Sequence, residues 1–285
     1  RATEEGLPAV QLCGFHGQTV FHQPEAGRTI QLGDGNRLAR LCGLPVIYDF
    51  RRADMQAGGQ GAPLAPVYHQ ILLRQDGCPH PAGFLNLGGI ANLTACTDTQ
   101  LLGFDTGPAN ALTDAVCQSE LGLAYDKDGA IAAKGHISAS FLKAALQDSY
   151  FQRSGPRSLD WANFSDYLQH PDFRTLSVED KLASLTALSA QSIAISISGL
   201  PFVLKTLVVA GGGVQNKTMM KMISDALPDG ITVTTAEDIG AASDMIEAEL
   251  IAVLAARYLA QLPSTWPETT GAHTAQIAGV RADPL

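Results

Sequence analysis

The sequence predicts a mixed α/β fold, and three observations support this prediction. Short apolar segments of strand length alternate with longer segments of helical periodicity along most of the chain. Two of the apolar segments run directly into glycine-rich turns, GFLNLGGIANLT at 83–94 and LVVAGGGVQN at 207–216. The 285 residues are 46% hydrophobic and 16% charged, which suits a compact globule of one large or two ordinary domains.

Strands are expected where short runs of apolar and β-branched residues are bounded by turn residues. Such runs lie near 9–13, 28–32, 45–48, 83–87, 90–95, 101–104, 206–210 and 231–234. Helices are expected where apolar residues recur at three- and four-residue spacing, as at Met219, Met220, Ile223 and Leu227. Such segments lie near 36–42, 64–74, 109–121, 128–134, 138–148, 179–198, 214–227 and 244–261. Glycines make 58–63 a predicted hinge, and 156–171 is a predicted polar linker.

Three segments indicate a phosphate-binding site. Gly88 and Gly89 separate two apolar runs, a pattern that predicts a β-hairpin with a tight glycine turn. In LLGFDTGPANALTD a strand is expected to end on Asp105 and a helix to open near Asn110. Gly211–Gly213 then join a strand to a helix, which lets a nucleotide lie against bare backbone. A single glycine turn is most often only a turn, and a strand-end aspartate is usually a cap. The three segments in this order suggest a kinase.

Three further segments carry candidate substrate-binding residues, and each also has a purely structural explanation. His16 in GFHGQTVFHQP either binds substrate hydroxyls or satisfies local backbone groups. DFRRAD contains Arg51, which is suited to a substrate carboxylate, and Asp54; a surface ion-pair cluster explains the same charges. Glu247 heads an apolar helical stripe, where it either binds a sugar oxygen or is a first-turn acid favoured by the helix dipole.

The composition argues against nucleic-acid and membrane partners. The net charge is −9 and the pI is about 5.2, and no basic cluster occurs beyond Arg51 and Arg52. The five cysteines show no C-x-x-C spacing, so we expect reduced thiols in a cytoplasmic protein and no metal site. No signal peptide is visible, and serines, Gly199, Pro201 and Lys205 interrupt the longest apolar stretch, so no membrane span is expected.

Taken together, the motifs closely resemble the anhydro-N-acetylmuramic acid kinase family. They are HGQT (16–19), DFRRAD with GGQGAPL (49–64), LNLGGIANLT (85–94), GFDTGPAN (103–110), AGGGVQN (210–216) and TGA (270–272). The resemblance implies an α/β, two-lobed actin/hexokinase/Hsp70-like (RNase H-like) fold with an interlobe cleft and an incomplete N-terminal lobe. It implies a sugar-side lobe of residues 1–58 and 264–285, and a nucleotide-side lobe of residues 59–263.

The resemblance also implies the reaction. Such kinases use water to open the 1,6-anhydro bridge of the amino sugar and phosphorylate its 6-oxygen from ATP with Mg²⁺. The products are N-acetylmuramic acid 6-phosphate and ADP, in peptidoglycan (cell-wall) recycling. Asp105 matches the catalytic base, and the sugar-side matches are His16, Arg51, Asp54 and Glu247. The nucleotide-side matches are Gly88, Gly89, Asn92, Gly107, Gly211, Gly212, Gly213 and Asn216. A cytoplasmic homodimer is expected.

Two departures from the family pattern bear on activity. The chain begins at Arg1 without methionine, and the family's G-T-S-x-D-G hairpin, its first phosphate site, does not occur in it. We therefore expect a piece of a longer polypeptide; if these residues were the whole molecule, weak or no kinase activity would follow. Ala109 stands where the family carries glycine, and we expect its methyl group to be tolerated near the phosphates.

Two other functions stay open on the sequence alone. One is a nucleotide or sugar sensor that keeps the fold without catalysis, and the other is an ordinary kinase of a free hexosamine. The presence of Asp105, Arg51 and Glu247 together favours the enzyme, because a pure binder has no use for a base that activates water.

Overall fold

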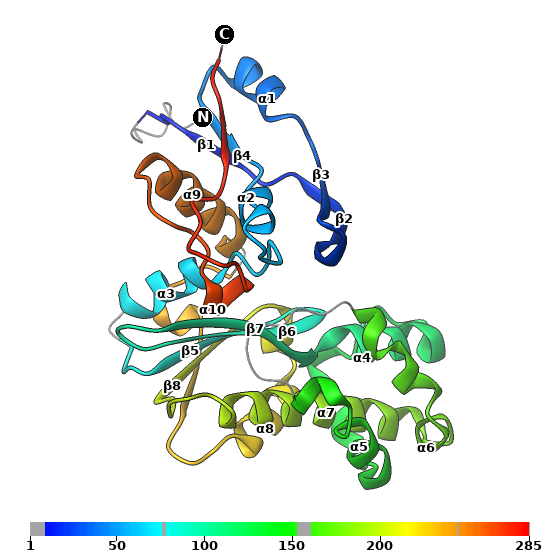
Figure 1. The fold of residues 1–285 in the computed structure, drawn as a ribbon. Helices are drawn as coiled ribbons and strands as arrows, with labels where there is room; N and C mark the ends of the chain where they lie inside the picture. The colour runs from blue at the N-terminus through cyan, green and yellow to red at the C-terminus, as the bar shows by residue number, and fades with distance from the viewer. Residues whose placement is uncertain (1–8, 76–77, 153–160, 244, 285) are drawn as a thin grey trace. The chain divides into compact units, whose positions relative to one another are not determined.

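The chain folds into two compact units (Figure 1). The computed structural model describes residues 9–75, 78–152, 161–243 and 245–284. Unit 1 comprises Arg1–Tyr68 and Asp244–Leu285, and unit 2 comprises His69–Ser243. The second boundary differs from the expected 263/264 because helix α9 (Ile246–Leu259) packs against strands of unit 1, and the first lies at 68/69 rather than 58/59. The assignment of a sugar side and a nucleotide side to lobes stays a prediction.

Unit 2 is built on a five-stranded sheet of order β7-β6-β5-β8-β9. Its strands are β5 (Ala82–Leu87), β6 (Ile90–Cys96), β7 (Leu101–Pro108), β8 (Thr206–Ala210) and β9 (Thr232–Thr235). β6 is antiparallel to β5 and β7, whereas β5, β8 and β9 run parallel to one another. Counted along the chain, the order is 3-2-1-4-5 with only the second strand reversed, which is the RNase H-like arrangement. The predicted α/β fold class is confirmed.

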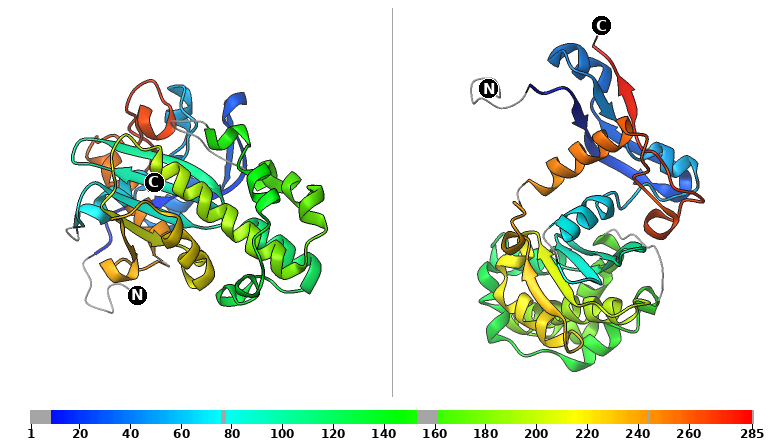
Figure 2. Two further views of the ribbon diagram at one scale, coloured as in Figure 1. Left: turned by 90° about the horizontal axis from the view of Figure 1, so that it is seen from below. Right: turned by 90° about the vertical axis from the view of Figure 1, so that its left-hand side faces the viewer.

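Two helices cover one face of this sheet, α7 (Val178–Ser198) and α8 (Lys217–Ala226) (Figures 1 and 2). Ile193 of α7 and Ile223 of α8 are fully buried against alternate strand residues such as Leu85 and Leu93. Strand side chains alternate between faces, so Phe84 points to the opposite side. There the ring of His69, on helix α3 (Pro66–Gln75), stacks on Phe84 with centroids 4.1 Å apart.

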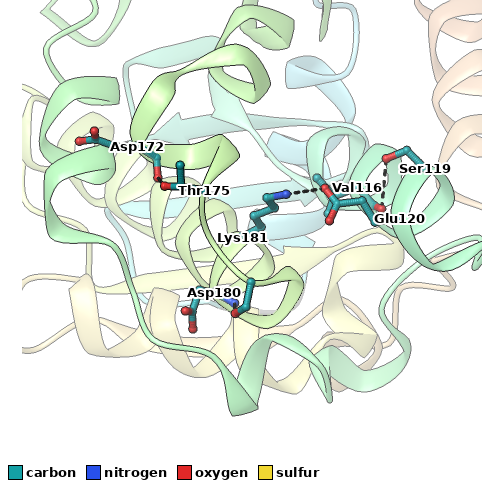
Figure 3. Close-up of polar contacts among 8 residues, drawn as sticks. Val116, Ser119, Glu120, Asp172, Thr175, Asp180 and Lys181 are labelled. Carbon is teal, nitrogen blue, oxygen red and sulfur yellow. Dashed lines mark hydrogen bonds and ion pairs between the residues drawn. The ribbon is translucent and has the colours of Figure 1, made fainter.

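A smaller helical region adjoins the sheet within unit 2. It contains α4 (Asn110–Val116), a π-helical turn (Cys117–Leu121), α5 (Ala139–Ala145) and α6 (Pro171–Arg174), and it has its own apolar core. Lys181 of α7 crosses to the π-helical turn, where its Nζ lies 2.8 Å from Glu120 Oε1 (Figure 3). The Lys181 side chain is only 12% exposed, so this ion pair ties α7 to the end of α4 in a partly dry setting.

Unit 1 contains a three-stranded sheet of order β1-β4-β10 and a separate β2-β3 hairpin. Its strands are β1 (Cys13–Phe15), β2 (Gln18–Gln23), β3 (Arg28–Leu32), β4 (Val46–Tyr48) and β10 (Val280–Ala282). Its other helices are α1 (Gly35–Cys42), α2 (Arg52–Gln56) and α10 (Pro267–Thr270). α9 packs on β1 and β4 (Figure 2), and its buried Leu254 joins Ile47 and Phe50 in the core.

Several local expectations were wrong. The first strand is 13–15 rather than 9–13, and strand β2 at 18–23 was missed, because its polar sequence QTVFHQ hides the pattern. Short β10 and α2 were missed. The expected helix at 128–134 is two 3₁₀ turns, because Asp128 and Gly129 have positive φ. In the expected linker, Trp161–Gln169 forms a 3₁₀ helix and Pro171–Arg174 is α6, while 153–160 lies outside the described residues.

Among the residues that the structure describes, no helix combines the length and the apolar character needed to span a bilayer.

Candidate functional site

Three polar residues form a row across the sheet of unit 2. Asn86 of β5 pairs with Asn92 of β6, and Asn92 pairs with Asp105 of β7. Directly paired residues share a face, so all three side chains leave the sheet on the side opposite α7 and α8. Each is half-buried, while most of their strand neighbours are fully buried. A carboxylate with two amides at one sheet edge is the arrangement of a binding or catalytic site rather than of a core.

Asp105 lies inside a strand rather than at its end. The expected strand end at Asp105 was wrong, because β7 continues to Pro108 through a bulge next to Thr106. The bulge shifts the register, since Asn92 pairs with Asp105 but Ala91 pairs with Gly107. Bulges of this kind re-aim side chains near functional sites. The hydroxyl of Tyr150 also donates to the Asp105 backbone carbonyl at 2.6 Å, which fixes the strand at this point.

The predicted hairpin is confirmed, with Gly88 and Gly89 between β5 and β6. The start of α4 holds this turn. The backbone N–H of Asn110 donates to the Gly88 carbonyl at 3.0 Å, and those of Ala109 and Ala111 donate to the Gly89 carbonyl at 3.0 and 3.1 Å. The Asn110 side chain adds a bond of 2.7 Å to the Gly88 carbonyl. Three backbone N–H groups at this helix start are therefore used within the protein, and anion binding by the glycine turn stays a prediction. Because the peptide is trans, the Gly89 N–H points away from α4.

The third glycine turn packs against the same hairpin. Gly211 has φ +85°, and a Cβ placed there would lie 2.5 Å from Asn86 Oδ1 and 2.8 Å from the Leu87 carbonyl oxygen. A Cβ on Gly213 would lie 2.6 Å from the Leu87 Cβ, whereas Gly212 is exposed with open space around it. Backbone can approach this closely only because these positions lack side chains. The turn after β8 and the turn after β5 therefore form one continuous backbone surface.

The remaining nucleotide-side predictions fall around this surface. Asn216 caps α8, with its Oδ1 accepting from the Met219 N–H at 2.9 Å. Gly107 is buried, and a Cβ there would meet Ser192 Oγ at 2.5 Å. Ala109 is also buried, and tolerance of its methyl group near the phosphates stays a prediction. Asn216 and Gly107 thus have clear structural roles, and their contact with a nucleotide stays a prediction.

In unit 1, Arg51 and His16 form a polar cluster. Arg51 Nη1 donates to the Gly61 carbonyl at 2.7 Å, and its Nη2 lies 3.0 Å from His16 Nε2. Arginine only donates, so His16 Nε2 accepts, and His16 Nδ1–H donates to the Gly17 carbonyl at 2.8 Å. Burial lowers the pKa of His16, and the Arg51 charge acts in the same direction, so the ring is neutral at pH 7.

Three other features surround this cluster. Asp54 is fully buried, and its two oxygens accept from the Gly61 N–H and the Thr270 hydroxyl. Glu247 is exposed in the first turn of α9, and its charge acts to raise the pKa of His16, which places the two residues near each other. A cavity of about 260 Å³ opens beside His16, between the β2-β3 hairpin and the end of β4.

The structure separates the predicted site residues into two groups. His16, Arg51, Asp54 and Glu247 gather in unit 1, while Asp105 and all the predicted nucleotide-side residues gather at one edge of the unit 2 sheet. Sequence reasoning missed Asn86, Asn110 and Tyr150. Asn86 could have been found, because it is a polar residue between Leu85 and Leu87 in an otherwise apolar strand. Tyr150 gave no local signal, since it lies 45 residues from Asp105.

The sheet order of unit 2, with glycine turns at one edge, is that of the actin/hexokinase/Hsp70-like class. The model of the family described as anhydro-N-acetylmuramic acid kinase matches residues 4–283. The chain is 43% identical to that kinase from Methylobacterium nodulans, with 99% of this chain and 75% of that one covered. It is 42% identical to the one from Zymomonas mobilis, with 93% and 71% covered.

One solved structure with a low sequence identity is also similar to this chain. Component A of the (R)-2-hydroxyglutaryl-CoA dehydratase from Acidaminococcus fermentans matches with a TM-score of 0.41 and 16% identity, over 69% of this chain and 67% of that one. The family model covers residues 4–283, and the sequence identities to the two kinases above are 43% and 42%. The chain belongs to the anhydro-N-acetylmuramic acid kinase family, and it is a kinase.

Proposed function

We propose that this kinase opens 1,6-anhydro-N-acetylmuramic acid with water and phosphorylates the 6-oxygen from ATP, giving N-acetylmuramic acid 6-phosphate and ADP. The row of Asn86, Asn92 and Asp105 beside the two glycine turns carries this proposal. It supplies a carboxylate next to exposed backbone amides, in a member of this kinase family. Peptidoglycan recycling, a cytoplasmic location and a homodimer remain predictions that accompany it.

Asp105 is the proposed general base. Its carboxylate takes a proton from a water molecule as the water oxygen forms a bond to the anomeric carbon. The bond from that carbon to the 6-oxygen breaks, and the released oxygen attacks the γ-phosphorus of ATP while ADP leaves. General-base catalysis of this kind contributes about 10²- to 10⁴-fold in rate. The fixed backbone at Asp105, held by Tyr150, supports this role because a base must be positioned before it is effective.

The glycine turns are proposed to hold the phosphates and the adenosine side of ATP. Backbone N–H groups at Gly88 and Gly89, and the close turn at Gly211–Gly213, present amide dipoles without side chains in the way. A magnesium ion would screen the phosphate charges. It usually keeps water and phosphate ligands and needs few protein oxygens, so the amide oxygens of Asn86 and Asn92 fit it.

The sugar is proposed to bind through His16, Arg51, Asp54 and Glu247. Arg51 suits the lactyl carboxylate, because guanidinium binds carboxylate through parallel N–H donors and its Nε is buried without a hydrogen-bond partner among the described residues. The exposed Glu247 suits a sugar hydroxyl. Asp54 is fully buried, so its contribution is made through Gly61.

Turnover of the anhydro sugar with Mg-ATP, followed by ADP release, tests this function. We expect Asp105→Asn to lose about 10²- to 10⁴-fold in kcat while the affinity for the sugar is kept. Asp114→Asn is the matched control, since Asp114 is a half-buried carboxylate on nearby α4 that lies outside the polar row. Normal turnover by Asp105→Asn would show that another group is the base.

The same assay separates the alternatives. A sensor would bind the anhydro sugar or ATP without releasing ADP. An ordinary hexosamine kinase would phosphorylate the open sugar, N-acetylmuramic acid, at least as well as the anhydro form. Preference for the anhydro sugar is the result expected here.

A further inference from the structure

A continuous chain of hydrogen bonds in unit 1 connects the C-terminal segment to His16. The Thr270 hydroxyl donates to Asp54 Oδ1 at 2.6 Å, and the Gly61 N–H donates to Asp54 Oδ2 at 2.7 Å. The Gly61 carbonyl in turn accepts from Arg51 Nη1 at 2.7 Å, and Arg51 Nη2 donates to His16 Nε2 at 3.0 Å. Three separate motifs and the terminal TGA segment thus meet in one network.

Two residues of this hydrogen-bond network, Thr270 and Asp54, cannot contact a ligand directly. Thr270 and Asp54 are both fully buried. A Cβ on Gly59 would lie 2.2 Å from Asp54 Oδ2, so the loop wraps tightly over the carboxylate. The Gln60 N–H also donates to the Thr270 backbone carbonyl at 2.8 Å. Thr270 and Asp54 therefore act on a ligand only through the loop at 58–61.

The loop sets the plane of the Arg51 guanidinium. With Nη1 held by the Gly61 carbonyl and Nη2 by His16, the planar group has one orientation, and its remaining N–H donors point in fixed directions. Its Nε is buried and has no hydrogen-bond partner among the described residues. A guanidinium fixed in this way loses little entropy when it binds a planar, two-oxygen anion.

We propose that Thr270 is a positioning residue for the substrate carboxylate, acting through Asp54 and Gly61 on Arg51. This inference rests on the proposed function, in which Arg51 binds the lactyl carboxylate. Without the Thr270 hydroxyl, Asp54 keeps its charge but loses a buried donor, and the backbone at Gly61, whose N–H and carbonyl belong to successive peptide units, gains freedom to rotate. The Arg51 guanidinium then binds the substrate carboxylate less tightly, while the bicyclic sugar ring and ATP are bound as before.

Two sugars make the test specific for the carboxylate. One is 1,6-anhydro-N-acetylmuramic acid, and the other is 1,6-anhydro-N-acetylglucosamine, which keeps the bicyclic ring and lacks the lactyl group. We expect Thr270→Val to raise the Kd and the KM for the first sugar about tenfold, as when one charge-assisted hydrogen bond is weakened. The Kd for the second sugar, the KM for ATP and kcat should stay within about twofold, because they do not involve the fork.

Two further variants control for folding. Thr270→Ser keeps the hydroxyl and should bind both sugars like the natural protein. Thr265→Val removes a fully buried hydroxyl of the same segment that has no hydrogen-bond partner among the described residues, and it should change neither sugar's Kd. If Thr270→Val does not fold, Asp54→Asn replaces it, since the amide keeps an oxygen for Gly61 but removes the charge.

Each outcome bears on a separate claim. Equal weakening of both sugars by Thr270→Val, or no change in either, would overturn the positioning role. A natural protein that turns over the anhydro sugar but binds the two sugars equally well would overturn the assignment of Arg51 to the carboxylate. Failure of the proposed function itself appears differently, as absence of ADP release with a folded natural protein.

Discussion

His16 and Arg51 determine each other's chemical state. Arg51 has no lone pair to accept with, so the 3.0 Å contact between them exists only while His16 Nε2 is unprotonated. Burial and the neighbouring positive charge both lower the pKa of His16, which preserves that state at neutral pH. The Gly61 carbonyl and His16 each accept from one Nη of Arg51, which leaves the Nε–H and the second N–H of each Nη for a ligand. The surface ion-pair explanation holds for Arg52, whose Nε lies 2.9 Å from Asp49 Oδ2, whereas Arg51 is a partly buried cation with a fixed orientation.

Replacing Arg51 tests whether its fork or only its charge matters. Arg51→Lys keeps the charge but cannot reach Gly61 and His16 in one plane, so we expect the KM for the anhydro sugar to rise about 10- to 100-fold with kcat nearly unchanged. Steady-state kinetics with saturating Mg-ATP measures this split. Arg40→Lys, an exposed arginine of α1 in the same unit, should behave like the natural protein. Equal KM values for the two variants would refute the bidentate role.

At the scale of elements, the turn after β8 depends on the absence of a side chain at Gly211. We expect Gly211→Ala to be destabilised by about 1–3 kcal/mol, because φ +85° with ψ 174° is a conformation essentially limited to glycine, and by roughly 1–3 kcal/mol more for the contact with Asn86 and Leu87. The affinity for ATP should fall as well, because the turn must move away from the hairpin. Urea unfolding and nucleotide titration measure the two effects.

Gly230 supplies the matched control for this turn. It also has positive φ, +87°, but a Cβ there would have nothing within 4 Å. Gly230→Ala should therefore lose only the backbone part of the stability, with no change in ATP affinity. Similar losses in the two variants would mean that close packing of the turn on β5 is unimportant.

The local elements were predictable where sequence pattern and burial agree. The hairpin at 83–95, the strand at 206–210 and the long helix near 179–198 were found because each is apolar and lies in a core. β2 and β10 were not, because one is largely polar and the other has only three residues, so neither produces a clear alternation. The strand end was misplaced at Asp105 because a bulge carries the pairing through Thr106 to Pro108.

The candidate site was predictable only in part, for a physical reason. Motifs reveal which residues have unusual chemistry, and Asp105, Arg51 and the glycines were found in this way. They do not reveal register or long-range contacts. The row that joins Asn86, Asn92 and Asp105 depends on strand pairing, and the bond from Thr270 to Asp54 spans 216 positions of the chain. Such contacts are products of the tertiary fold.

At the scale of the whole molecule, polar groups buried by folding make stability depend on pH. His69 is fully enclosed between α3 and the sheet, with Nδ1 2.8 Å from Thr94 Oγ1 and its ring stacked on Phe84. Burial lowers its pKa from 6.5 to about 3. The pKa values of His16 and His22 are also lowered, chiefly by burial, so both units carry histidines that are neutral when folded.

These histidines predict that acid destabilises the protein before its carboxylates titrate. Below pH 6.5 the unfolded chain takes up a proton on His69, while the folded chain does not until about pH 3, so stability is complete above pH 6.5 and falls with pH across this window. The slope from one such group approaches about 1.4 kcal/mol per pH unit. His69→Gln keeps a polar partner for Thr94 but removes this titrating group. Between pH 6.5 and 5, the slope of its unfolding free energy against pH should therefore be lower by up to about 1.4 kcal/mol per pH unit. Urea unfolding at several pH values measures this difference. An unchanged acid slope in His69→Gln would show that the buried ring takes up its proton in the folded state.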